Sequence, residues 1–181
     1  MSKTIMLSIR PKWVEKIVNG EKTIEVRKTR PKMNTPFKCY IYCTLPKYPH
    51  EDFIATDYPR PQFYGGGRVI GEFTCNRIDR LAPADEPYGI YDIGDDYVLQ
   101  TCLENGALWD YGHGTPLYGW HISDLRIYDT PKELSEFKTL CRVDADCCAC
   151  PYYNYTKMDC DGRVIGRPPQ SWCYVDDVQD K

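Results

Sequence analysis

The segment from Leu7 to Lys28 constrains the fold more than any other part of the sequence. Pro11 follows a short β-prone run, and proline is favoured at the first position of a helix. Apolar residues of the next two turns share one helical face, and Asn19-Gly20 predicts the helix end. Residues 22–27 then alternate polar and apolar, which is typical of a half-buried strand. The segment therefore predicts strand, helix, turn and strand, with a polar row of Thr23, Glu25 and Arg27 and with Lys22 at its entrance.

Two stretches of the sequence resemble the ASCH family, a branch of the PUA-like β-barrels. The first comprises the helix-ending Gly20, the pair Lys22-Thr23 and the run Glu25-Val26-Arg27. The second is Tyr118–Leu125, which resembles the closing strand of the family. The resemblance implies a small barrel with a cleft, in a group generally regarded as nucleic-acid or nucleotide binding.

Three further stretches predict β-strands. Phe37–Cys43 alternates between two faces, and Arg68–Ile78 and Trp120–Tyr128 also have the pattern of strands. Gly71 marks a bulge or a point of close packing. The connection over residues 44–67 ends in three glycines and lacks the lysine and hydroxyl residue of a P-loop, so it predicts a flexible loop beside the cleft.

Short helices are expected at the ends of the sheet. Residues 97–103 fit either a short helix or a strand, and Asn105-Gly106 predicts a turn. Thr130–Glu133 has the capping-box pattern of a helix that reaches about Lys138. The predicted fold class is therefore mainly β with short helices (α+β), arranged as a PUA-like, partly open β-barrel with helical decoration.

The length of 181 residues predicts one domain with an appendage. We expect the PUA-like barrel over residues 1–140 and a Cys-rich extension over residues 141–181. No apolar run approaches the length that spans a bilayer, and the apolar patch near the N-terminus is too short for a secretory signal. These features predict a cytoplasmic protein with no membrane partner.

The net charge of −3 conceals a strong asymmetry along the chain. Residues 1–48 hold 11 Lys and Arg against 3 acidic residues, whereas the remaining residues hold 12 against 23. A basic N-terminal part on an acidic body is typical of a local polyanion-binding surface, although such lysines also simply solvate a surface. The acidic total disfavours tight nonspecific binding to long duplex DNA.

RNA, or a modified nucleotide within it, is the predicted partner. We expect Lys22 and Arg27 to contact phosphate or base edges and Thr23 and Glu25 to position them, because these residues lie in the ASCH-like motif. Bases of single-stranded RNA can stack on exposed aromatic side chains, so we expect a base to stack on Tyr118 or Trp120. The alternative for Trp120 is burial in the core. Arg10 and His121 complete the predicted set of ligand-binding residues. The alternative for His121 is a purely structural role.

A hydrolase is the alternative function, and whether the protein is an enzyme is left open by the sequence. Some members of the ASCH group resemble amidases that act on acetylated cytidine, and these carry a threonine two positions before the strand arginine, where this chain has Glu25. In a catalytic interpretation Lys22 activates Thr23, while Glu25 orients Arg27 or holds a water. Recognition is favoured over chemistry.

Six of the ten cysteines lie after residue 140. Cys147 and Cys150 have the spacing of a zinc knuckle, and Cys160 and Cys173 complete a possible four-thiolate structural zinc site. Cys148 or Cys141 are the substitutes in that set. Disulfides and free thiols are the alternatives, of which the cytoplasm disfavours disulfides.

The C-terminal tail suggests a third function, a protein-interaction module. Arg167–Trp172 resembles an arm flanked by prolines. It either folds back over the barrel and brings Trp172 towards the cleft, or it binds a protein partner.

Overall fold

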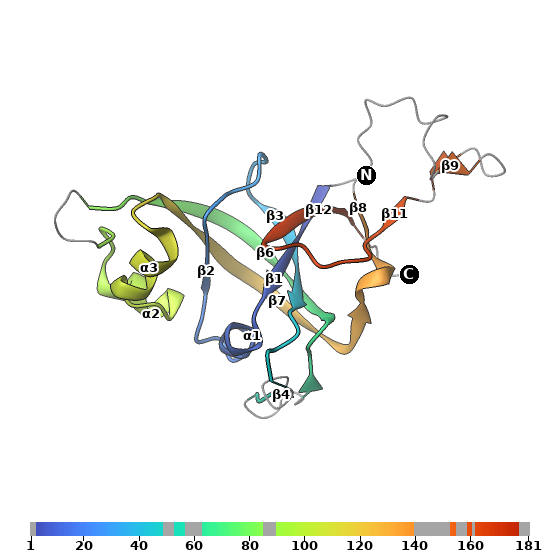
Figure 1. Ribbon diagram of the computed structural model, residues 1–181, viewed down its shortest axis with the longest axis horizontal. Helices are drawn as coiled ribbons and strands as arrows, with labels where there is room; N and C mark the ends of the chain where they lie inside the picture. Colours follow the sequence, from blue (N-terminus) through green and yellow to red (C-terminus); the bar gives the residue numbers. More distant parts are fainter. Residues whose placement is uncertain are drawn as a thin grey trace.

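The computed structural model describes residues 3–48, 53–56, 63–84, 90–139, 153–154, 159–160 and 162–177. Most strands belong to one open sheet (Figure 1). It runs in the order β11 (Arg163–Val164), β8 (Lys138–Thr139), β12 (Trp172–Asp176), β1 (Lys3–Ile9), β3 (Phe37–Cys43), β6 (Arg68–Leu81), β7 (Leu117–Glu133) and β2 (Ile24–Arg27). β1 and β3 are parallel, and all other neighbouring strands in this sheet are antiparallel. The predicted mainly β, α+β architecture with an incompletely closed sheet is confirmed.

The strands predicted from the sequence are present, and β6 and β7 are longer than expected. Gly71 of β6 lies beside a shift of register between β3 and β6. A Cβ atom placed on Gly71 would lie 2.4 Å from the backbone oxygen of Arg126 in β7. The predicted close-packing role of Gly71 is therefore confirmed, because no larger residue fits without moving a neighbouring strand.

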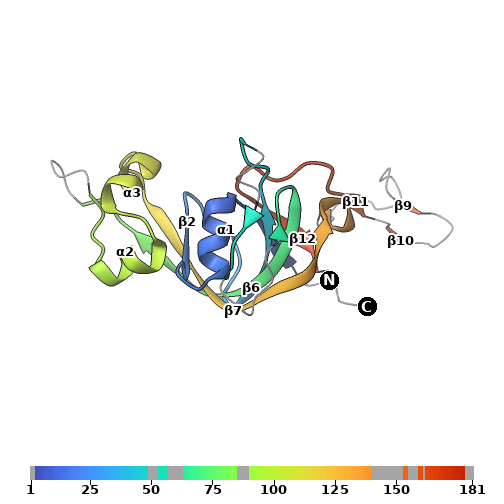
Figure 2. The same ribbon diagram turned by 90° about the horizontal axis from the view of Figure 1, so that it is seen from below.

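Three α-helices accompany the sheet within the described residues. α1 (Pro11–Val18) begins at the predicted proline, and Gly20 follows it with a positive φ of 78°. α2 (Asp95–Thr101) settles the ambiguity over residues 97–103 in favour of helix. Figures 1 and 2 show α2 and α3 (Asn105–Gly112) together at the end of the sheet that β2 borders.

Two predictions about local structure are wrong. Asn105-Gly106 opens α3 rather than forming an isolated turn, because the Asn105 side chain accepts the Tyr91 N–H at 2.7 Å and donates to the Tyr91 carbonyl at 3.2 Å. The Asn105 side chain is therefore committed to the neighbouring backbone. These two bonds dock the start of the helix on the chain that precedes α2.

Thr130–Glu133 likewise does not open a helix. These residues extend β7, whose Lys132 and Glu133 pair with Val69 and Arg68 of β6. The capping box instead lies three residues later, where the Glu133 N–H donates to Glu136 at 2.7 Å and starts a 3-10 turn over Leu134–Glu136. Pairing with the long neighbouring strand overrides the local helix signal.

The core lies on both faces of the sheet. The side chains of β1 alternate between the two faces of the sheet. Ile5, Leu7 and Ile9 belong to the cluster that contains α1, whereas Met6 belongs to the cluster on the opposite face. The largest cluster joins Val14 and other apolar residues of α1 to β1, β3, β6 and Trp120. A separate cluster holds α3 against β2 and β7. Burial on both faces fixes the position of α1 and of β2 next to it.

The tail contributes strands to the same sheet. β12 pairs antiparallel with β1, and Leu7 lies opposite Trp172 in this ladder. The described residues also form two small hairpins, β4 (Phe53–Ile54) with β5 (Phe63–Tyr64) and β9 (Tyr153–Asn154) with β10 (Asp159–Cys160). The division into residues 1–140 and 141–181 stays a prediction, although the sheet includes strands from both parts. Among the described residues, no helix has the length and apolar character needed to cross a bilayer.

Candidate functional site

A pocket of about 510 Å³ opens between α1, β2, α3 and the segment that precedes β12. Its walls come from parts of the chain that are far apart in sequence. The polar and aromatic lining residues are Ser8, Arg10, Lys12, Trp13, Lys22, Glu25, Arg27, Thr44, Tyr111, Gln170 and Ser171. The pocket therefore contains four of the residues that the sequence predicted for ligand binding, namely Arg10, Lys22, Glu25 and Arg27.

Three charged side chains form a buried row along one wall of this pocket. Only 1% of the Lys22 side chain and 8% of the Glu25 and Arg27 side chains are exposed. The Glu25 carboxylate lies 3.0 Å from Arg27 Nη2 and 3.5 Å from Lys22 Nζ. The row carries more positive than negative charge in a place where water is largely excluded, which strengthens its interaction with an anion.

Lys22 also forms a hydrogen bond to the C-terminal end of α2. Its Nζ donates to the backbone oxygen of Thr101 at 2.5 Å, and Thr101 is the last residue of α2. A cation at this position is favoured by the unpaired carbonyls at a helix C-terminus. Burial lowers the pKa of Lys22, and the nearby Glu25 carboxylate acts in the opposite direction.

Arg27 links β2 to β1 and to the chain before β12. Its Nη2 donates to the backbone oxygen of Ser8 at 2.8 Å, and its Nη1 lies 3.4 Å from Ser171 Oγ. β1 and β2 are separated by three strands in the sheet order, so these side-chain contacts draw the open sheet into a barrel-like cleft. Arg27 Nε is buried and has no hydrogen-bond partner among the described residues. An unpaired buried donor of this kind is costly to the stability of the fold.

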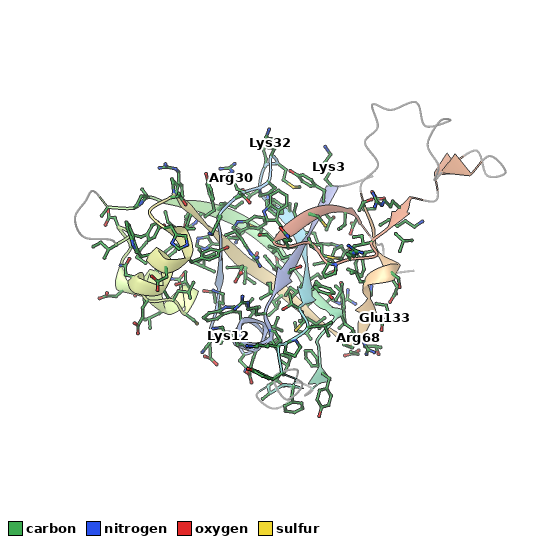
Figure 3. The ribbon with its side chains drawn as sticks, viewed as in Figure 1. Lys3, Lys12, Arg30, Lys32, Arg68 and Glu133 are labelled. Carbon is green, nitrogen blue, oxygen red and sulfur yellow. The ribbon has the colours of Figure 1, made fainter. Side chains whose placement is uncertain are left out.

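Cations lie over aromatic rings in the pocket and near it. Lys12 and Lys22 place their Nζ atoms 4.5 and 5.2 Å from the centroid of the Trp13 ring. Lys28 lies 5.0 Å from the centroid of the half-exposed Tyr111 ring. Figure 3 shows Lys12 on α1, whereas Arg30 and Lys32 lie in the loop between β2 and β3.

Thr23 is not part of this pocket. It is exposed, its N–H donates to the Gln100 carbonyl at 2.9 Å and its own carbonyl accepts from Ile122 at 2.9 Å. These backbone contacts hold Thr23 between α2 and β7. Lys22 and Glu25 line the pocket, but Thr23 does not. The structure therefore does not place both members of the lysine–threonine pair of the catalytic interpretation in the pocket.

The aromatic and histidine residues predicted on the closing strand also lie elsewhere. Trp120 is fully buried, with Phe37 edge-on at 5.7 Å and Trp172 at 6.0 Å between ring centroids, so it has no exposed face for a base. Tyr118 is half-buried, lies opposite Arg27 in the β2–β7 ladder and packs against the main core. Trp120 is thus a core residue, which corrects the stacking role expected for it and agrees with the alternative.

His121 belongs to a second polar cluster. Its Nε2 lies 2.6 Å from Asp79 Oδ2 and 2.9 Å from Arg77 Nη2. Its strand neighbour across the ladder is Ile24, and it does not line the pocket. His121 is a histidine with hydrogen-bond partners, which agrees with the structural alternative.

The predicted zinc ligands are only partly described. Cys141, Cys147, Cys148 and Cys150 lie outside the described residues, and of Cys160 only the backbone in β10 is described. Cys173 lies in β12, where burial raises the pKa of its thiol to about 11. Zinc binding by the tail stays a prediction.

Several pocket residues were missed by sequence reasoning. Trp13 belongs to the apolar face of α1 and packs against the main core, so the sequence pattern does not point to a ligand-binding role, and Tyr111 lies in a helix that the sequence did not predict. Gln170 and Ser171 reach the pocket because the arm before β12 folds back, where Ser8 donates its N–H to Ser171 at 2.9 Å. The proline-flanked arm was the available signal for these last two residues.

Comparisons with known proteins agree with this fold. The family model of the ASCH domain matches residues 7–47. The structure resembles the crystal structure of ASCH from Zymomonas mobilis, with 19% sequence identity, a TM-score of 0.56, and coverage of 94% of this chain and 86% of that chain. A variant of the same Zymomonas mobilis protein gives 18% identity, a TM-score of 0.53, and coverage of 96% and 90%.

No curated protein matches the sequence significantly. The family match contains α1 and β2, and therefore the row of Lys22, Glu25 and Arg27. The structural match extends over nearly the whole chain. Residues 7–47 thus match the ASCH domain, and the chain as a whole has the fold of an ASCH protein.

Proposed function

We propose that the pocket binds a nucleotide, either within RNA or as a modified nucleotide. The observation that carries this proposal is the largely buried charged row of Lys22, Glu25 and Arg27, which lines the pocket. A guanidinium donates to phosphate or to the acceptor edge of a base, and the Glu25 carboxylate accepts from a base amino group. The volume of about 510 Å³ lies in the range of small-ligand pockets.

The aromatic lining supports the same ligand class. Trp13 and Tyr111 border the pocket, and Tyr111 retains an exposed face. Stacking of a base on such a ring contributes about 1–3 kcal/mol, whatever the base. Arg10 and Lys12 at the rim are exposed and available for phosphate contacts.

The direct test is fluorescence anisotropy with short single-stranded RNA and DNA at two salt concentrations. We expect salt-sensitive binding that Arg27→Ala and Lys22→Ala abolish and that Tyr111→Ala weakens about fivefold or more. Because Lys22 and Arg27 are buried, circular dichroism must show that each variant is folded. The exposed Lys12→Ala tests the same site without disturbing the core.

Lys132→Ala is the matched control, since Lys132 lies on β7 over Tyr128, at 4.6 Å from its ring centroid, and does not line the pocket. It should bind as tightly as the unmodified protein. Absence of binding to any oligonucleotide or modified nucleoside at micromolar protein, or binding that the pocket variants leave unchanged, contradicts the proposal.

A hydrolase remains a second candidate because of Lys22. Burial lowers the pKa of this lysine and so favours its neutral form, which can act as a base, while Glu25 beside it acts in the opposite direction. Turnover of acetylated cytidine that Lys22→Ala abolishes would favour this function. Thr23→Ala separates the mechanisms, since Thr23 does not line the pocket and its loss should leave a reaction based on Lys22 and Glu25 intact.

A further inference from the structure

A second hollow adjoins the first pocket on the other side of the start of α1. It has a volume of about 770 Å³ and lies between α1, the chain that follows β3, and β4. Arg10, Lys12 and Thr44 line both hollows. The two hollows therefore adjoin each other at two exposed cations and a threonine.

The β4–β5 hairpin borders the second hollow through Phe53 and is anchored to the rest of the fold. Figure 1 shows β4 beside α1, and Ile54 of β4 is fully buried in the main core. Asn19, just after α1, donates its Nδ2 to the Ala55 carbonyl at 3.1 Å. The hairpin is thus anchored to α1 by an apolar and a polar contact.

This anchored hairpin presents aromatic rings to solvent. Phe53, which lines the hollow, is 40% exposed, and its cross-strand neighbour Tyr64 is 67% exposed at 5.4 Å between ring centroids. Lys47 also lines the hollow and lies 5.2 Å from the ring centroid of exposed Tyr48. Aromatic faces interleaved with cations are typical of surfaces that bind single-stranded nucleic acid.

The charges of the second hollow suit a polyanion. Its lining has the cations Arg10, Lys12 and Lys47 against the single carboxylate of Glu15. The cations shared by the two hollows lie where a phosphate would join two nucleotides. An acidic peptide would also meet this charge, but it would not use the exposed faces of Phe53 for stacking.

We propose that the second hollow binds the nucleotide adjacent to the one in the first pocket. The protein then recognises a single-stranded segment, with the connecting phosphate at Arg10 and Lys12 and the neighbouring base on Phe53. This inference rests on the proposed function of the first pocket and narrows its ligand from a free nucleotide to a single-stranded oligonucleotide.

The test compares ligands of different length on the full chain. Anisotropy is measured with fluorescein-labelled random-sequence RNA hexamers, and an equal mixture of the four nucleoside monophosphates is used as competitor. We expect the hexamer to bind at least about tenfold more tightly than the monophosphates, since each additional stacked base and phosphate contact adds affinity.

Two variants then locate the added affinity. Phe53→Ala should weaken hexamer binding about fivefold or more and leave monophosphate binding unchanged. Lys47→Ala should make the slope of log K against log salt shallower by about 0.7, the value for one phosphate contact of a single strand. Leu99→Ala, an exposed apolar residue on α2, and Lys132→Ala are the matched controls and should change neither ligand.

The outcomes separate this inference from the function on which it rests. If hexamer and monophosphates bind equally, or if Phe53→Ala and Lys47→Ala leave hexamer binding unchanged while Arg27→Ala abolishes it, the second hollow is not a nucleotide site and the first pocket stands. If neither ligand binds, both proposals fail. An acidic peptide that displaces the hexamer through Lys47 while Phe53→Ala has no effect also overturns the inference.

Discussion

Two polar clusters of similar composition lie in different surroundings in this protein. The first is the pocket row of Lys22, Glu25 and Arg27, and the second joins Arg77 and Asp79 of β6 to His121 of β7. Each cluster combines one carboxylate with two basic side chains at short distances. In the second cluster 64% of the Arg77 side chain, 28% of Asp79 and 16% of His121 are exposed, against 1–8% in the first.

The difference in burial changes the strength of the electrostatic interactions in each cluster. Solvent screens the charges of Arg77 and Asp79, so their attraction contributes little to stability. In the pocket row, burial removes hydration, lowers the pKa of Lys22 and leaves Arg27 Nε without a partner among the described residues. Groups of similar chemistry therefore form a partly solvated cluster in one place and a buried charged row in the other.

The largest effect is expected for Glu25→Gln. This change leaves Lys22 and Arg27 as two buried cations without their carboxylate, and loss of one member of a buried ion pair costs about 3–5 kcal/mol. Urea denaturation followed by circular dichroism measures the free energy of unfolding. The double variant Glu25→Gln/Lys22→Met removes one of the two cations and should recover part of the loss. Equal stability of Glu25→Gln and the unmodified protein would show that the row is solvated.

A smaller effect is expected for Arg27→Lys. Lysine keeps the charge but cannot reach both Ser8 and Ser171, so we expect a loss of about 1–3 kcal/mol in the free energy of unfolding. The Ser8 N–H, which donates to the Ser171 carbonyl, should exchange faster with deuterium in this variant. Amides in β6, such as that of Phe73, serve as the internal control. Unchanged exchange at Ser8 would mean that Arg27 does not hold the arm.

The pH dependence of stability distinguishes Lys22 from a solvated lysine. Its folded pKa lies below the value of 10.5 for an unperturbed lysine because of burial. Between the folded pKa and 10.5 the unfolded chain binds the proton more tightly, so the contribution of Lys22 to stability rises with pH in that window. The free energy of unfolding of the unmodified protein, minus that of Lys22→Met, should increase from pH 7 to pH 10.

The sequence predicts the positions of Lys22, Glu25 and Arg27 along the chain better than it predicts the segments that surround them in the fold. Proline and glycine bound α1, and strict alternation predicts β2, so Lys22, Glu25 and Arg27 are placed by local rules. Burial of this polar row is not a local property. It depends on α3, which the sequence did not predict, and on the arm at Gln170, which is more than a hundred residues away.

The failures on the closing strand have the same origin. Alternation correctly places Trp120 and His121 on opposite faces of a strand, but it does not identify which face meets solvent. Both faces of this sheet are covered, so Trp120 enters the core while His121 pairs with Asp79 of the adjacent strand. The capping box at Thr130 fails similarly, because pairing with β6 outweighs a local helix signal.

The smallest effect is expected for Asp79→Asn in the exposed cluster. It removes the partner of Arg77 and His121, yet exposed pairs contribute only about 0.2–1 kcal/mol, so the free energy of unfolding should fall by no more than that. Salt at about 1 M shortens the screening length to about 3 Å and should reduce the difference, most of all the part due to exposed Arg77. Glu25→Gln should keep most of its effect in the same salt, because its partners are buried. A loss for Asp79→Asn that matches Glu25→Gln and survives high salt would contradict the role of burial, and chemical composition alone would then determine the stability of both clusters.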